Sequence, residues 1–306
     1  MTPELVIIGI LTSGIRLATP YLYASIGETF GQRSGVLNLG VDGQMLLGAF
    51  AAFYVAFTTG DLGLGLLAAV VVGAVMGLAM AFVTVNLHAQ QGISGIGFYL
   101  FGLGMSDLLF KMLLGTVETV KGFPPLNIPL LGDIPVVGEI FFQQNIMVYG
   151  AFLLVPVAWL VLNKTTLGLK IRSVGENPEA ADSLGVSVAR IRYFTIILGG
   201  ILSGVAGASM SIALLNVFQQ NMTSGLGFIA VALVYFGAWR VRGVLIGALL
   251  FSMVNSLQLW MQVLNVPIPS ELAVMMPYVL TIVVLVATVS RVRSPSALTK
   301  PFDRGD

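Results

Sequence analysis

Nine long apolar stretches, separated by shorter polar ones, constrain most strongly what this chain can fold into. The core of a lipid bilayer needs about 20 apolar residues per helix, and most stretches are close to that length. They cover residues 4–27, 36–58, 62–87, 91–114, 145–163, 193–215, 224–239, 243–264 and 271–290. Only 9% of the residues are charged, whereas a soluble domain carries about 25%. The sequence predicts an all-α, polytopic transmembrane helix bundle of about nine spans (8–10), folded as one domain over residues 1–306.

The composition also argues against several classes of function. The chain has no cysteine and one histidine, so disulfides, thiolate metal sites and a histidine metal cluster are not expected. No GxxxxGK[ST] phosphate-binding loop is present, and the scattered carboxylates form no nucleophile–base pair. The net charge of +1 argues against nucleic-acid binding. We therefore expect no catalytic residues, no cofactor and no resident metal.

The longest polar interval between two apolar stretches covers residues 163–193. It holds five basic residues: Lys164, Lys170, Arg172, Arg190 and Arg192. Basic loops are retained in the cytoplasm, and alternation of the spans then places twelve of the fifteen Lys and Arg residues on that side. This orientation puts the N-terminus outside and the C-terminus in the cytoplasm.

Within this interval, residues 178–184 carry the signals of a short helix. Asn177 can cap the first backbone N–H groups, and Pro178 suits the first helical position. Glu179 lies where the helix dipole favours negative charge, and Gly185 can adopt the left-handed conformation that ends a helix. A stray helical turn in a loop is the alternative interpretation.

The run Glu179-Ala180-Ala181, followed after three residues by Gly185, resembles the EAA-x3-G loop of membrane subunits of ATP-binding cassette (ABC) importers. The resemblance implies a cytoplasmic coupling loop over residues 164–192, whose helix fits a cleft on a separate ATPase. The Ile/Leu-Pro pair that often follows in the family is missing here. This departure indicates the sugar, branched-chain amino acid and nucleoside branch.

A glycine-rich segment over residues 27–48 does not suit a lipid-facing helix. It has six glycines interleaved with polar side chains, and irregular backbone at membrane depth must be buried in protein or line a cavity. It is either a broken or re-entrant segment, with Asn38, Asp42 and Gln44 as candidates for the substrate pathway, or a tight cytoplasmic turn. The residues from Glu28 to Gly43 resemble the E-x4-RSGVxNxGxEG signature of nucleoside importer permeases, with Asp42 in place of the usual Glu.

A second polar segment precedes the seventh apolar stretch. Its amides and aromatic rings are Asn216, Gln219, Gln220, Asn221, Phe218 and Phe228. Amides together with aromatic faces suit a neutral, ring-bearing ligand, although the same residues would also make an ordinary external turn. Residues 227–233 resemble the matching segment of the nucleoside permeases.

Charged residues within or beside the apolar stretches are candidates for buried charges, and the main ones are Arg16, Glu28, Asp107 and Lys111. Because a charge inside the membrane is costly, we expect Arg16 to face protein, water or a carboxylate, with an ion pair favoured over a substrate contact. Asp107 and Lys111, one helical turn apart, are expected to neutralise each other, with a coupling-ion or proton site as the alternative. The long external loop over residues 115–144 contains four prolines. It is either a platform for an external solute-binding protein, as the resemblance implies, or a linker.

Taken together, the residues and the resemblance predict an ABC importer permease that moves a nucleoside, with a purine nucleoside favoured, by alternating access. The resemblance implies three partners in a bacterial or archaeal inner membrane: a cytoplasmic ABC ATPase, an external solute-binding lipoprotein and a second, related permease. Membrane lipid surrounds the spans. A permease for ribose or another simple sugar is the nearest alternative. An ion-coupled secondary transporter using Asp42, Asp107 and Lys111, or a membrane scaffold, is the more distant one.

Overall fold

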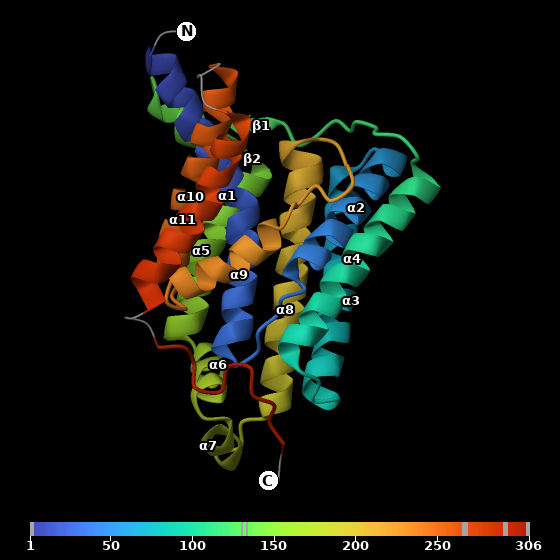
Figure 1. Ribbon diagram of the computed structural model, residues 1–306, viewed down its shortest axis with the longest axis vertical. Helices are drawn as coiled ribbons and strands as arrows, with labels where there is room; N and C mark the ends of the chain where they lie inside the picture. Colours follow the sequence, from blue (N-terminus) through green and yellow to red (C-terminus); the bar gives the residue numbers. More distant parts are fainter. Residues whose placement is uncertain (1–2, 130, 133, 265–268, 290–292, 304–306) are drawn as a thin grey trace.

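The computed structural model is a bundle of helices that run roughly along one axis (Figure 1). The structure describes residues 3–129, 131–132, 134–264, 269–289 and 293–303. The long helices are α1 (Pro3–Arg33), α2 (Val41–Thr59), α3 (Leu62–Ala81), α4 (Gln91–Leu113), α5 (Ile146–Lys164), α8 (Val188–Ser209), α10 (Val241–Val263) and α11 (Ser270–Val289). The shorter helices are α6 (Thr166–Glu176), α7 (Pro178–Ser183) and α9 (Leu226–Phe236), with π-helical turns η1 (Phe82–Asn86), η2 (Gly138–Phe142) and η3 (Met210–Leu214). The predicted all-α class is confirmed.

Seven helices within the described residues are long and apolar enough to cross a membrane: α1, α2, α3 with η1, α4, α5, α8 with η3, and α10. Helix α11 has 20 residues, which is also a spanning length. Helix α9 has only 11 residues, and at 1.5 Å per residue it covers about half of the bilayer core. The predicted full span over residues 224–239 is therefore wrong, and a half-length helix stands in its place.

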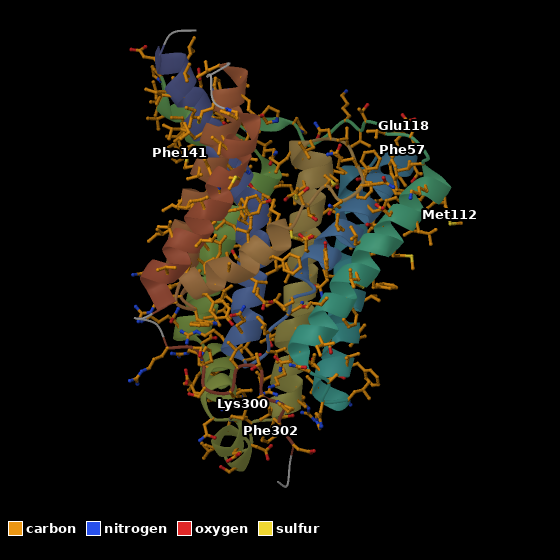
Figure 2. All side chains as sticks on the ribbon, viewed as in Figure 1. Phe57, Met112, Glu118, Phe141, Lys300 and Phe302 are labelled. Carbon is orange, nitrogen blue, oxygen red and sulfur yellow. The ribbon has the colours of Figure 1, made fainter. Side chains whose placement is uncertain are left out.

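The two ends of the bundle differ in structure. Strands β1 (Pro125–Asn127) and β2 (Gln143–Asn145) form a small antiparallel hairpin, with Leu126 opposite Gln144. This hairpin lies near the N-terminus, and we call this end of the bundle the β end (Figure 1). Helices α6 and α7 and the C-terminus lie at the opposite, α7 end. Figure 2 shows Phe141 and Glu118 at the β end and Lys300 and Phe302 at the α7 end.

Helix α8 lies in the centre of the bundle and packs against α1, α2 and α3. Glycines allow this close approach: a Cβ atom at Gly73 of α3 would lie 2.3 Å from the carbonyl oxygen of Gly200 of α8, and one at Gly204 would lie 2.4 Å from that of Ala69. Gly73 and Gly77 of α3, four residues apart, thus pack against α8, where Gly200 and Gly204 have the same spacing. They fix the position of the central helix.

The C-terminal tail binds the α7 end through its backbone. The N–H of Ala297 donates to the carbonyl oxygen of Gly175 in α6 (2.9 Å), and the N–H of Thr299 donates to that of Gly35 (3.1 Å). Ala297 is buried. The tail therefore joins α6 to the segment that follows α1.

Candidate translocation and coupling sites

Helix α7 has the capped geometry that the sequence predicts. The Oδ1 atom of Asn177 accepts a hydrogen bond from the N–H of Ala180 (3.0 Å), and Pro178 is the first helical residue. Glu179 lies exposed in the first turn. Gly185 follows with a left-handed φ of 83°, which a residue with a side chain adopts only with strain. The helix ends at Ser183, one residue earlier than predicted.

Helix α7 is anchored on one side and exposed on the other. Ala181 is only 3% exposed and belongs to the main core, in which α7 packs against α6 and α8. Leu184, directly after the helix, is 84% exposed. Its side chain is available for contact with a protein partner, next to the capped helix. No sequence signal distinguishes Leu184, because the same interval contains other apolar residues such as Leu167 and Leu169.

The glycine-rich segment forms a buried, extended connection between α1 and α2. Helix α1 continues to Arg33, and residues 34–40 are mostly buried. Glu28 holds this connection, because one of its carboxylate oxygens accepts hydrogen bonds from the N–H of Asn38 (3.0 Å) and from Nε2 of Gln32 (2.9 Å). Gln91 of α4 accepts another from the N–H of Leu37 (2.8 Å). Outside the helix, the buried backbone N–H groups of Leu37 and Asn38 thus have side-chain acceptors in place of helical ones.

Asp42 links two non-helical segments of the bundle, residues 34–40 before α2 and residues 215–225 before α9. It lies in the first turn of α2, and its Oδ1 accepts a hydrogen bond from the N–H of Gly227 at the start of α9 (2.7 Å). Its Oδ2 accepts another from the hydroxyl of Thr223 (3.0 Å). A Cβ atom at position 227 would lie 2.4 Å from the backbone nitrogen of Asp42, so Gly227 permits this approach. One carboxylate therefore lies at the positive ends of two helix dipoles.

The two other polar candidates of this segment, Asn38 and Gln44, are also buried. Asn38 donates from Nδ2 to Oε1 of Gln44 (3.2 Å), and its own Oδ1 accepts from the N–H of Gly40 (2.8 Å). Gln44 is fully buried, and its Nε2 has no hydrogen-bond partner among the described residues. These hydrogen bonds therefore stabilise the connection between α1 and α2. The Nε2 group of Gln44 remains without an acceptor among the described residues.

The candidates of the second polar segment divide into a buried and an exposed group. Phe218 is fully buried against the rings of Phe50 (centroids 5.3 Å apart) and Phe110 (5.7 Å). Asn216 has a left-handed φ of 58°, and its buried Oδ1 lacks a partner among the described residues. The exposed group, which is the part of this segment that a ligand could reach, contains Gln219, Gln220, Asn221 and Phe228.

The expectations for the charged residues are partly wrong. Arg16 is exposed and donates from Nε to Oε1 of Gln144 (2.8 Å), so an amide takes the place of the expected carboxylate. Asp107 and Lys111 make no ion pair within 4 Å, because Lys111 is exposed and the buried Oδ1 of Asp107 has no partner in the described structure. Of these four residues, only Glu28 is buried.

Comparison with known proteins identifies the family. Residues 10–285 match the family model described as "Branched-chain amino acid transport system / permease component". The chain is 39% identical to the putative glucose ABC transporter permease TsgC13 of Haloferax volcanii, over 97% of this chain and 98% of the relative. It is 36% identical to the guanosine ABC transporter permease NupQ of Bacillus subtilis, over 94% of each chain. It is also 36% identical to the nucleoside ABC transporter permease NupC of Lactococcus lactis, over 92% of each chain.

Two further results complete this comparison. A second guanosine permease of Bacillus subtilis, NupP, is 27% identical over 84% of this chain and 74% of its own length. No solved structure matches the chain. The match to the family model and the matches to full-length relatives show that the chain belongs to the branched-chain amino acid transport system permease family, as an ABC transporter permease of the nucleoside and simple-sugar type.

Proposed function

We propose that this chain is the membrane subunit of an ABC importer that carries a nucleoside, with a purine nucleoside favoured. The observation that carries the proposal is the 36% identity, over more than nine-tenths of each chain, to permeases named for guanosine and for nucleosides. The exposed amides at 219–221 and the exposed ring of Phe228 support it. They offer edge hydrogen bonds and a stacking face, which are the contacts that a nucleobase uses.

We place the α7 end in the cytoplasm and the β end outside the cell. Basic residues gather at the α7 end: Arg33 at the end of α1, Arg172 in α6, Arg240 before α10, and Lys300 in the tail (Figure 2). The positive-inside rule places an end that is rich in Lys and Arg in the cytoplasm. The arrangement gives an external N-terminus and a cytoplasmic C-terminus in a bacterial or archaeal cell membrane. The β hairpin and the loop over residues 115–144 then face an external solute-binding protein.

Coupling to ATP hydrolysis runs through α7 in this proposal. A cytoplasmic ATPase receives Leu184 and Glu179 in a cleft, and the buried Ala181 transmits its movement to α6 and α8. Helix α8 contacts α1, α2 and α3, so its displacement alters the two non-helical segments that Asp42 links. The bundle thereby alternates between outward and inward openings, and the chain itself hydrolyses no ATP.

A second permease subunit completes the pathway in this proposal. Bacillus subtilis has two guanosine permeases, NupQ and NupP, that are both similar to this chain. This pairing supports a heterodimer of related permeases. The polar candidates Asn38 and Gln44 are buried and bond to each other, so they do not make a complete ligand shell within one chain.

Uptake by the assembled transporter tests the substrate. We expect transport of labelled guanosine that depends on ATP and is inhibited by excess unlabelled purine nucleoside but not by glucose or ribose. A simple sugar is the second candidate, because TsgC13 is a putative glucose permease and is 39% identical to this chain. Inhibition by glucose or ribose without inhibition by guanosine would establish the sugar and reject the nucleoside. Uptake that survives ATP depletion would reject the ABC mechanism.

A further inference from the structure

A basic cavity opens at the α7 end, away from helix α7 itself. Its volume is about 270 Å³, and it lies between the last residue of α1, the end of α5 and the turn from α9 to α10. Three arginines, two tryptophans and an amide line it: Arg33, Arg240, Arg242, Trp159, Trp239 and Asn163. No role in transport or coupling described above uses this cavity.

The cavity concentrates positive charge that no direct ion pair within the described residues neutralises. None of the three arginines forms an ion pair within the described structure, and the buried Nε of Arg33 has no hydrogen-bond partner there. Arg172 and Arg240 add positive potential at Arg33, and Glu176 is the acidic neighbour that opposes them. An unpaired buried donor is costly, so this arrangement favours an anionic ligand.

Backbone groups add to this potential. Arg240 occupies the N-cap position of α10 and gives no side-chain cap, because a guanidinium has no acceptor. The first N–H groups of α10 therefore remain free of a side-chain acceptor, at the positive end of the helix dipole. Arg240, Val241 and Arg242, which form this helix start, all line the cavity. A phosphate group matches such a combination of free N–H groups and guanidinium donors.

The turn that presents these arginines is strained and held in place. Ala238 and Trp239 have left-handed φ values of 53° and 55°, a conformation that costs L-residues free energy. The buried Trp239 holds the turn, because its Nε1 donates to Oε1 of Gln32 (2.7 Å) and its ring packs against Tyr235 (centroids 4.8 Å apart). Strain that the surrounding packing maintains is typical of ligand sites.

Aromatic and apolar groups beside the cavity indicate a lipid as the source of the phosphate. The guanidinium carbon of Arg242 lies 5.0 Å from the centroid of the Trp159 ring, and tryptophan is enriched at the level of lipid headgroups. Leu160, next to Trp159 in sequence, is exposed. Ile246, one helical turn after Arg242, is exposed as well. We propose that this cavity binds the phosphate headgroup of an anionic phospholipid, whose acyl chains lie along α5 and α10.

Binding by the purified full-length chain tests this site without requiring transport. The probes are short-chain phosphatidylglycerol, short-chain phosphatidylcholine and inorganic phosphate, titrated in detergent and followed by native mass spectrometry and thermal unfolding. We expect the chain to bind phosphatidylglycerol in preference to the other two and to unfold at a higher temperature when it is bound. Arg240→Gln together with Arg242→Gln should weaken this binding at least about 10-fold, because each change removes a charged hydrogen bond.

Arg190→Gln is the matched control, since Arg190 is an exposed arginine that does not line the cavity. It should keep the affinity of the unchanged chain. The single variant Arg242→Gln serves if the double variant is poorly folded, because this side chain is exposed. Equal lipid binding by the Arg240/Arg242 variant and the Arg190 variant would overturn the site. Inorganic phosphate or phosphatidylcholine bound as tightly as phosphatidylglycerol would overturn the assignment to an anionic lipid.

Discussion

At the scale of single residues, Asp42 shows how one side chain can serve two helices. Its carboxylate lies in the first turn of α2 and accepts hydrogen bonds from Gly227 and Thr223, which are far away in sequence. Hydrogen bonds to a charged acceptor are worth about 1.5–3 kcal/mol each, and burial excludes the water that would compete for them. Asp42 therefore joins the start of the spanning helix α2 to the start of the half-length α9.

Replacing Asp42 tests this role. Asp42→Asn keeps the shape but removes the charge and one of the two acceptor oxygens. We expect the free energy of unfolding to fall by about 1–3 kcal/mol, because one hydrogen bond loses its acceptor and the other becomes a weaker, neutral bond. Thermal unfolding in detergent measures it. Asp61→Asn is the control: Asp61 caps α3 at an exposed site, where Asn is about as good a cap as Asp. Equal effects at both positions would contradict a special role for Asp42.

At the scale of elements, α7 shows how a helix too short to be stable alone is maintained. An isolated helix of six residues is marginal in water, yet α7 has a cap at Asn177, a proline start and one buried side chain, Ala181. Its other residues are left mostly exposed. The packing that stabilises α7 and the surface that we propose for the ATPase contact are thus on different residues, and they can be altered separately.

Truncating the exposed tip of this element should uncouple the transporter. In the complex with its ATPase, we expect Leu184→Ala to lower substrate uptake about 10-fold, because a leucine buried in a partner's cleft contributes about 1.5–3 kcal/mol. ATPase activity should continue without responding to substrate. Glu179→Gln should act in the same direction.

The neighbouring Leu169 offers a matched control for this test. It is also an exposed leucine, on α6, and Leu169→Ala should leave uptake unchanged. Normal uptake with Leu184→Ala, at equal amounts of inserted protein, would exclude α7 as the coupling element.

At the scale of the whole molecule, the bundle has two chemically distinct ends. The β end carries the hairpin and the long loop, and the α7 end carries helices α6 and α7 and the C-terminal tail (Figure 1). The half-length α9, together with the segment that precedes it, still crosses between the ends, so the alternation of the helices is preserved. The proposed orientation in the membrane depends on this arrangement as a unit.

Cysteine labelling can test the orientation directly, because the natural chain has no cysteine. Ser183→Cys on α7 and Thr116→Cys in the loop after α4 place single thiols at exposed positions of opposite ends. A membrane-impermeant maleimide added to intact cells should label position 116 alone, and permeabilised cells should be labelled at both. Labelling of position 183 in intact cells would show that α7 lies outside the cell, where it could not contact a cytoplasmic ATPase.

The sequence predicted those features that local chemistry controls. The apolar runs identified the bundle, and the Asn177, Pro178 and Gly185 signals located α7 to within one residue, because capping acts over three or four neighbours. Helix α6 was missed, because its two glycines lower its helix propensity. It forms through packing, since Gly175 fits against the carbonyl of Arg33 and Ile171 is fully buried.

The amino-acid sequence by itself determined the class of fold, the family signatures and the caps of helix α7, because each depends on hydropathy or on residues close together in the chain. Only the tertiary structure decided that α9 is half a span, that Asp42 caps it, and that Arg16 meets Gln144 while Asp107 and Lys111 remain apart. The physical reason is that a buried polar group takes whichever partner the packing brings within hydrogen-bond distance. That partner can lie more than a hundred residues away, where no periodicity or spacing in the sequence indicates it.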